Sequence, residues 1–230
     1  MTHHQKQEAL FASIEAGFKA GAAPSTIVNV QKDFSQDPLR SLTNIAFIPE
    51  LLDLKLVQQL FHELRTVASQ QYVYPRESIH TTIKNVRTVN DPPRFTQEEI
   101  ERIRPVIREV ACRYQSIEIE WKGLLELPTS LAIRGFSSEA LTRLVLDLHG
   151  ALIQAGVPDD KRYASMELFA SSCTICRYQA PLDENTRRLI QRFKQVPFGR
   201  TVLKEFSLVI TDSVASKSVV RVIETFPLGR

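Results

Sequence analysis

The stretch Ser78–Lys84, which reads SIHTTIK, decides the fold prediction. Its β-branched residues predict a strand. Because alternate residues of a strand share a face, the side chains of His80, Thr82 and Lys84 are expected to point the same way. An imidazole that exchanges protons near neutral pH, a hydroxyl donor and an ammonium that offsets negative charge together suit a phosphate group. For this stretch alone, a histidine without a chemical role on a half-exposed sheet is the simpler alternative.

A second stretch, Phe169–Arg177 with the sequence FASSCTICR, repeats the pattern. The same alternation predicts that Ser172, Thr174 and Cys176 share a face. The first two of these have the spacing of the histidine and threonine in the first stretch, and an isoleucine follows each threonine. Taken alone, a core strand made of small residues explains this stretch equally well.

Hydrophobic periodicity predicts an order of elements that is typical of an α+β fold. A strand–helix–strand unit near 44–86 recurs near 129–178, an offset close to the 92 residues between His80 and Ser172. A capping box beginning at Thr96 predicts the start of one helix. The predicted helices cover residues 1–23, 51–68, 96–114, 136–156 and 183–196, and the predicted strands cover residues 44–48, 78–86, 116–127, 129–134, 166–178, 206–211 and 219–225.

The composition is that of an ordinary globular protein, with 43% hydrophobic and 24% charged residues in a chain of 230. The net charge of +3 argues against a broad nucleic-acid-binding surface but allows a local basic site. Three cysteines, an odd and low count, favour a reducing compartment over a disulfide framework. The N-terminus has no secretory pattern, and no apolar stretch approaches the roughly 18 residues of a spanning helix. We therefore expect a cytoplasmic protein without membrane association.

The two stretches resemble the paired motifs of the two-histidine (2H) phosphoesterase superfamily, which includes LigT-like 2′–5′ RNA ligases and cyclic phosphodiesterases. The hallmark of that family is an H-x-[ST]-hydrophobic motif on one strand of each lobe. Residues 80–83 fit the first motif fully. Residues 172–175 fit the second, except that Ser172 stands where a histidine is expected. Arg177 follows at the offset where many members carry an arginine.

This resemblance implies a bilobal LigT-like fold, with two pseudo-symmetric antiparallel sheets and flanking helices around a central cleft. Residues 42–228 would form this single domain, and residues 1–41 an N-terminal extension with an amphipathic helix. It also implies a hydrolase or ligase that acts on a nucleotide or RNA phosphodiester, such as a 2′,3′-cyclic phosphate or a 2′–5′ linkage. We expect no cofactor, no metal and a monomeric protein.

The resemblance also assigns roles to individual side chains. His80 would act as the general acid or base, and the hydroxyls of Thr82, Ser172 and Thr174 would hold the phosphate. Arg177 would bind the substrate as a further cation, and Lys84 would do the same through the strand alternation described above.

Ser172 weakens the implied mechanism, because a serine hydroxyl is a poor proton carrier near neutral pH. General acid or base assistance is worth roughly 10²–10⁴-fold in rate. Neither the other four histidines nor Cys176 is a convincing substitute. Two functions stay open: a phosphoesterase with weakened catalysis, and a non-catalytic protein that binds nucleotide or RNA phosphates. A protein that keeps only the scaffold is less favoured, because the His80 motif and Thr174 are present.

Two other patterns carry less weight. Cys173 and Cys176 match C-x-x-C, but on a regular strand positions i and i+3 point to opposite faces, so a redox or zinc site is not expected. The basic stretch between Arg187 and Arg200 is more simply a charged helix face than an RNA-binding surface.

Overall fold

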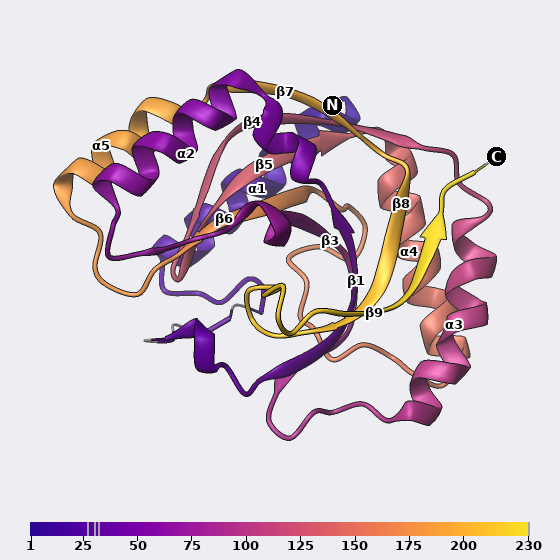
Figure 1. Cartoon of the computed structure of the whole chain (residues 1–230). Coiled ribbons are helices and arrows are strands. Elements are labelled where there is room, and N and C mark those ends of the chain that lie inside the picture. The colour runs from indigo at the N-terminus through magenta and orange to yellow at the C-terminus, as the bar shows by residue number, and fades with distance from the viewer. Residues whose placement is uncertain (27, 30, 32, 230) are drawn as a thin grey trace.

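The computed structural model describes residues 1–26, 28–29, 31 and 33–229. Over these residues the chain forms two antiparallel β-sheets and five α-helices (Figure 1). The expected α+β fold with two antiparallel sheets and flanking helices is confirmed. In the described part of the chain, no helix is both long and apolar enough to span a membrane.

The four-stranded sheet has the order β3-β1-β8-β9. Every neighbouring pair in it is antiparallel. Strand β1 lies inside the sheet, and all of its residues except the two at its ends are buried. The strands are β1 (Arg40–Phe47), β3 (His80–Asn90), β8 (Glu205–Thr211) and β9 (Arg221–Pro227).

The five-stranded sheet has the order β2-β6-β5-β4-β7 and is also antiparallel. Its strands β4 and β5 form a hairpin, and β6 pairs with the other edge of β5. The strands are β2 (Tyr72–Val73), β4 (Ile117–Leu127), β5 (Ser130–Ser137), β6 (Ser171–Arg177) and β7 (Pro197–Leu203).

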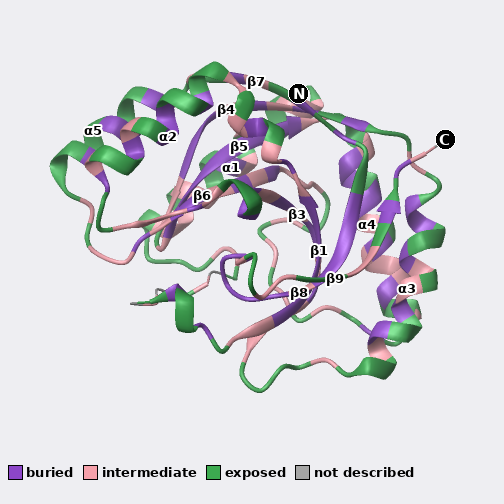
Figure 2. Cartoon of the chain, in the orientation of Figure 1, coloured by how far each residue is buried: buried purple, intermediate pink, exposed green. Residues whose placement is uncertain are grey.

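Two pairs of helices cover the sheets from outside (Figure 1). Helices α2 (Lys55–Val67) and α5 (Glu184–Phe193) pack together and contact the five-stranded sheet. Helices α3 (Gln97–Ala111) and α4 (Glu139–Gln154) pack together and contact the four-stranded sheet. The sides that face the sheets are buried and the outer sides are exposed, as Figure 2 shows for α2, α3 and α5. Three short 3-10 helices complete the fold: Phe34–Gln36, Pro49–Asp53 and Arg76–Ser78.

The predicted strand–helix–strand repeat corresponds to β1-α2-β3 and β5-α4-β6. In each unit the helix packs against the sheet that contains the strands of the other unit, because α2 contacts β2 and β7 while α4 contacts β3. This exchange of helices joins the two lobes into one body. Strands β3 and β6, which carry the two motifs, meet where the lobes adjoin.

Strand β3 contains a β-bulge at the last residue of its motif. Thr82 pairs with Ile45 and Lys84 pairs with Asn44, so two consecutive residues of β1 face three residues of β3. The extra residue is Ile83, and it is buried together with Lys84. A bulge of this kind shifts the alternation of side chains by one position. Lys84 therefore leaves the face that His80 and Thr82 share.

Strand β6 carries a bulge at the equivalent place. Thr174 pairs with Ala132 and Cys176 pairs with Leu131, which makes Ile175 the extra residue. The burial pattern from Ser172 onward repeats that of β3 from its histidine onward. The expectation that Cys176 shares a face with Ser172 and Thr174 is therefore wrong, because the bulge turns it to the buried side and brings Arg177 to the motif face.

Helix α1 (His3–Lys19) packs on strands β4 and β5, on the sheet face that also lines the interior between the sheets. Phe11 is 2% exposed, and its ring meets that of Phe136 edge to face with centroids 5.4 Å apart. Gln7 is fully buried, and its Oε1 accepts a hydrogen bond from the backbone N–H of Ser137 at 3.3 Å. The predicted amphipathic helix is therefore packed on the sheet by one side, and its outer side is exposed.

Predicted and observed elements agree except in three strands, of which the first, the two-residue β2, was not predicted. All five predicted helices are present, the capping box at Thr96 is formed, and Ser138 caps α4. Strand β6 begins at Ser171, whereas the sequence pattern placed its start at residue 166. Strand β7 was not predicted, because its Pro197 and Gly199 are residues that strands disfavour.

The docking of α1 can be tested with Phe11→Ala. Truncation of a buried phenylalanine removes about 3–5 kcal/mol of packing. Because α1 precedes both sheets in the chain, we expect local undocking: its amide hydrogens should exchange at least tenfold faster in native-state hydrogen exchange, with little change in β1 or β8. The matched control is Ile153→Ala, because the side chain of Ile153 on α4 is 48% exposed. Unchanged exchange in α1 of the Phe11 variant would contradict the described packing.

Candidate active site

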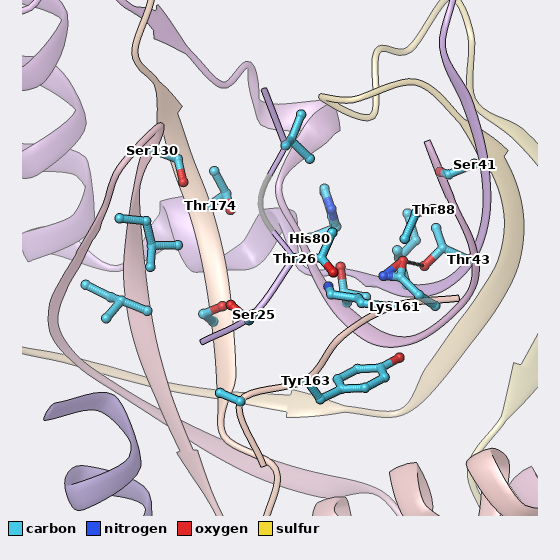
Figure 3. A pocket seen from close by; sticks show the side chains of 18 of the residues that line it. Ser25, Thr26, Ser41, Thr43, His80, Thr88, Ser130, Lys161, Tyr163 and Thr174 are labelled. Carbon is cyan, nitrogen blue, oxygen red and sulfur yellow. Dashed lines mark hydrogen bonds between the residues drawn. The ribbon is translucent and has the colours of Figure 1, made fainter. Parts of the chain in front are cut away.

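A cleft of about 290 Å³ lies between the two sheets and contains both sequence motifs. His80 and Thr82 reach it from β3, while Ser172, Thr174 and Arg177 reach it from β6. Figure 3 shows His80 and Thr174 on opposite sides of this space. The structure thus brings together five of the six predicted site residues, drawn from strands far apart in the sequence.

A contact between the backs of the two motif strands fixes this arrangement. The hydroxyls of Thr81 and Ser171 lie 2.6 Å apart, and the Thr81 hydroxyl is also 3.1 Å from the carbonyl of Ser172, to which it can donate. Both side chains are fully buried. Since their neighbours in the strands point the other way, His80 and Ser172 are directed into the cleft.

His80 is held in one orientation and one tautomer. Its Nδ1 lies 2.7 Å from the carbonyl oxygen of Ser78, which can only accept, so Nδ1 carries the proton and Nε2 of the neutral ring has a free lone pair. Ser78 is itself fixed, because its hydroxyl donates to the carbonyl of Ala215 at 2.7 Å. The rings of Phe47 and Tyr74 flank the imidazole, with centroids 6.5 and 6.4 Å from it. A neutral imidazole placed in this way can accept a proton.

The surroundings of His80 lower its pKa below the ordinary value for histidine. Burial is the largest cause, since it disfavours the charged ring, and the positive charge of Arg177 acts in the same direction. The hydrogen bond to Ser78 and the carboxylate of Asp212 oppose these effects without cancelling them. His80 is therefore mostly neutral at pH 7, the form that a general base requires.

Arg177 reaches the cleft because of the bulge in β6. Its Nε donates to the hydroxyl of Tyr74 at 3.3 Å, and its Nη2 donates to the carbonyl of Ser213 at 3.5 Å. These contacts leave other guanidinium N–H groups available for an anion. The position that the family resemblance assigned to Arg177 therefore lies at the same cleft as His80.

Lys84 does not line the cleft, contrary to the expectation from strand alternation. The bulge at Ile83 turns its side chain to the other side, where it is 1% exposed. Its Nζ lies 2.5 Å from Asp159 Oδ2, 3.0 Å from the Tyr163 hydroxyl and 3.1 Å from His149 Nδ1. The ammonium is thus engaged in a buried ion pair that anchors the segment after α4.

Three consecutive residues at the C-terminal end of β8 present polar atoms to the cleft that have no hydrogen-bond partner in the described structure. They are the hydroxyls of Thr211 and Ser213 and Oδ2 of Asp212. All three side chains are at least nine-tenths buried. Buried polar groups are rarely left unpaired, so these atoms point to a polar ligand or bound water at this end of the cleft.

Lys161 also lines the cleft and was not foreseen from the sequence. It lies in the irregular segment between α4 and β6, which has no periodicity from which side-chain directions can be read. Burial, Arg177 and Lys84 lower the pKa of its ammonium to about 8. Asp212 was missed for the same reason, since it lies in an irregular segment directly after the end of β8.

The cysteine pair takes no part in the cleft. Cys173 and Cys176 are both buried and free, and burial raises the pKa of each thiol to about 12. Within the described residues, no group of three or more histidine, cysteine or acidic side chains is arranged to hold a metal ion.

Comparison with solved structures identifies the fold. The protein TT0787 of Thermus thermophilus superposes with a TM-score of 0.60 at 19% identity, over 82% of this chain and 97% of that protein. Escherichia coli LigT in complex with ATP gives a TM-score of 0.56 at 10% identity, over 84% and 99% of the two chains. A phosphoesterase gives 0.52 at 8% identity, over 84% and 99%. The chain has the LigT-like fold.

The LigT-like fold that the motifs implied is thus confirmed by geometry. No protein-family model matches the sequence, and no curated protein matches it either. The roles of individual residues therefore rest on the contacts of this chain.

The opposing effects of Arg177 and Asp212 on His80 give a test of the cleft electrostatics. Arg177→Gln removes a positive charge that disfavours the imidazolium, so the pKa of His80 should rise. Asp212→Asn removes a negative charge that favours the imidazolium, so the pKa of His80 should fall. NMR titration of the His80 ring protons measures both, with the signal of the exposed His62 as an internal reference. Shifts in the same direction, or none, would show that these groups do not face His80.

A double-mutant cycle tests the buried ion pair of this LigT-like chain. Lys84→Met leaves the carboxylate of Asp159, which is 3% exposed, buried without its cation and should lower the free energy of unfolding by about 3–5 kcal/mol. Asp159→Asn in the same chain should recover part of the loss, since the uncompensated charge is gone. Denaturant unfolding measures both. Strictly additive effects would show that the two groups do not interact.

Proposed function

We propose that this chain is a 2H-type phosphoesterase that acts on a phosphodiester of a nucleotide or RNA, either a 2′,3′-cyclic phosphate or a 2′–5′ linkage. One observation carries the proposal: His80, three hydroxyls and Arg177, contributed by equivalent positions of two equivalent strands, line a single cleft. This set supplies a proton acceptor, neutral hydrogen-bond donors and a positive charge. These are the groups that a phosphodiester needs for binding and for attack at phosphorus.

In the proposed reaction, Nε2 of His80 takes the proton of the attacking water or hydroxyl. The hydroxyls of Thr82, Ser172 and Thr174 donate hydrogen bonds to the non-bridging oxygens, and Arg177 offsets their charge. Burial is the main reason that the His80 imidazole is neutral, and Arg177 acts in the same direction, so one cation assists both anion binding and proton acceptance. A hydroxyl at Ser172 can bind phosphate but cannot carry a proton near neutral pH.

The size and polarity of the cleft support a nucleotide-like ligand. Its volume of about 290 Å³ is close to the lower end of the range for small-molecule sites. The unpaired carboxylate oxygen of Asp212 accepts hydrogen bonds only, and a ribose hydroxyl or a base amino group could donate one. Solved structures of Escherichia coli LigT contain ATP or 3′-AMP, which supports the same ligand class for this cleft.

A non-catalytic role as a nucleotide- or RNA-phosphate-binding protein is the second candidate. The observation that favours it is Ser172, which occupies the place of the second histidine. Phosphate binding would survive that change better than catalysis, because the other donors are in place.

Activity assays with two variants separate the candidates. Wild type should hydrolyse at least one member of a panel of 2′,3′-cyclic nucleotides and 2′–5′ oligonucleotides, and His80→Ala should lower kcat by about 10²–10⁴-fold. His62→Ala, an exposed histidine on the outer face of α2, is the control and should be neutral. An inert wild type that binds nucleotide, together with turnover by Ser172→His, would favour the binding protein. Absence of both binding and turnover in all variants would refute both candidates.

A further inference from the structure

A cyclic phosphodiester is cleaved efficiently when one group accepts a proton from the nucleophile and another donates one to the leaving oxygen. Among the described residues that line the cleft, His80 is the only histidine. Lys161 also lines the cleft, and the pKa of its ammonium is lowered to about 8, which is near neutrality for a lysine. This residue belongs to the segment between α4 and β6, outside both motifs.

The segment that carries Lys161 is fixed against the edge of β3. Oδ1 of Asp160 accepts a hydrogen bond from the backbone N–H of Thr88 at 2.7 Å, and Arg87 donates to the carbonyl of Pro158. The buried pair of Lys84 and Asp159 ties the same segment to β3 from the other side. Lys161 therefore projects from an anchored backbone, which is what a proton-transfer group requires.

The Lys161 side chain points into the cleft, in the same space as His80 (Figure 3). Among the described residues its ammonium has no hydrogen bond and no ion pair, and its one described contact is with the ring of Tyr163, 5.8 Å from the centroid. The neighbouring carboxylate, Asp159, is engaged by Lys84. A half-buried ammonium without a partner is available to a ligand.

We propose that Lys161 is the second proton-transfer group of this cleft and acts as the general acid opposite His80. The proposal rests on the phosphoesterase function above. It assigns to a loop residue the task that Ser172 cannot perform.

The proposed step balances with water as the only co-reactant. Water loses a proton to Nε2 of His80 and its oxygen forms a bond to phosphorus. The bond from phosphorus to a ribose oxygen breaks, and that oxygen takes a proton from Nζ of Lys161. The products are a phosphomonoester and a free ribose hydroxyl, with His80 protonated and Lys161 neutral. Proton exchange with solvent restores both groups.

The charges around the two groups support this division of roles. Burial lowers the pKa of Lys161 to about 8, together with the positive charges of Arg177 on β6 and Lys84 on β3, and the carboxylate of Asp159 on its own segment raises it in part. His80 faces Arg177 and Asp212, and its pKa lies below the ordinary 6.5. At pH 7 the lysine is thus mostly protonated and the histidine mostly neutral, which makes them acid and base respectively.

Rate measurements across pH test the proposal. For wild type, kcat/KM should rise as His80 loses its proton below pH 6.5 and fall as Lys161 loses its proton near pH 8. Lys161→Met should lower kcat by about 10²-fold or more and abolish the alkaline limb. Lys161→Arg keeps the positive charge, but a guanidinium does not release its proton near neutral pH and cannot act as the general acid. KM should therefore stay near that of wild type, while kcat falls as in the methionine variant. Lys204→Met, an exposed lysine between β7 and β8, is the control.

Addition of Ser172→His to the Lys161→Met variant should restore turnover, because it returns an imidazole to the position opposite His80. Full activity in Lys161→Arg, or an alkaline limb that persists in Lys161→Met while His80→Ala is inactive, would overturn the role of Lys161 and leave the phosphoesterase function intact. A wild type inert on every cyclic and 2′–5′ substrate would overturn both.

Discussion

The contact between Thr81 and Ser171, two buried hydroxyls 2.6 Å apart, is the interaction on which the cleft depends. It joins the backs of β3 and β6 at the boundary between the two sheets. With the backs in contact, the alternate side chains of both strands must face the same interior space. The two motifs therefore share a cleft although they lie 92 residues apart in the sequence. The bulges at Ile83 and Ile175 then set which later residue of each strand points into the cleft. Arg177 on β6 points into the cleft, and Lys84 on β3 points away from it.

The sequence was informative wherever geometry is local. Strand alternation over residues 80–82 predicted the directions of His80 and Thr82. Hydrophobic periodicity located all five helices. The inward turn of Arg177 and outward turn of Lys84 could not be read, because a bulge depends on how the neighbouring strand pairs. Lys161 gave no signal at all, since an irregular segment has no period and its place in the cleft follows from its anchoring to β3.

Segments outside the two repeated units make the two sides of the cleft different. Helix α1 covers part of the cleft-facing side of β4 and β5, so this wall of the cleft combines residues of α1 with Leu125, Ser130 and the motif face of β6. The segment after α4 contributes Lys161 and Tyr163 from the opposite edge. The symmetric frame thus supplies similar groups from both sides, while the added segments make the two sides chemically different. A pair of unequal proton-transfer groups is a natural outcome of such a frame.

The contacts of α1 with residues far along the chain also constrain the order in which the protein folds. Gln7 contacts Ser137, 130 positions later, and β1 is enclosed only when β8 pairs with it. Most of the stability of a helix in a protein comes from the packing of its apolar side and little from intrinsic propensity. During synthesis, α1 leaves the ribosome well before its partner strands and must therefore wait, largely unfolded, until the β4–β5 hairpin exists. Residues made early are thus among the last to reach their native positions.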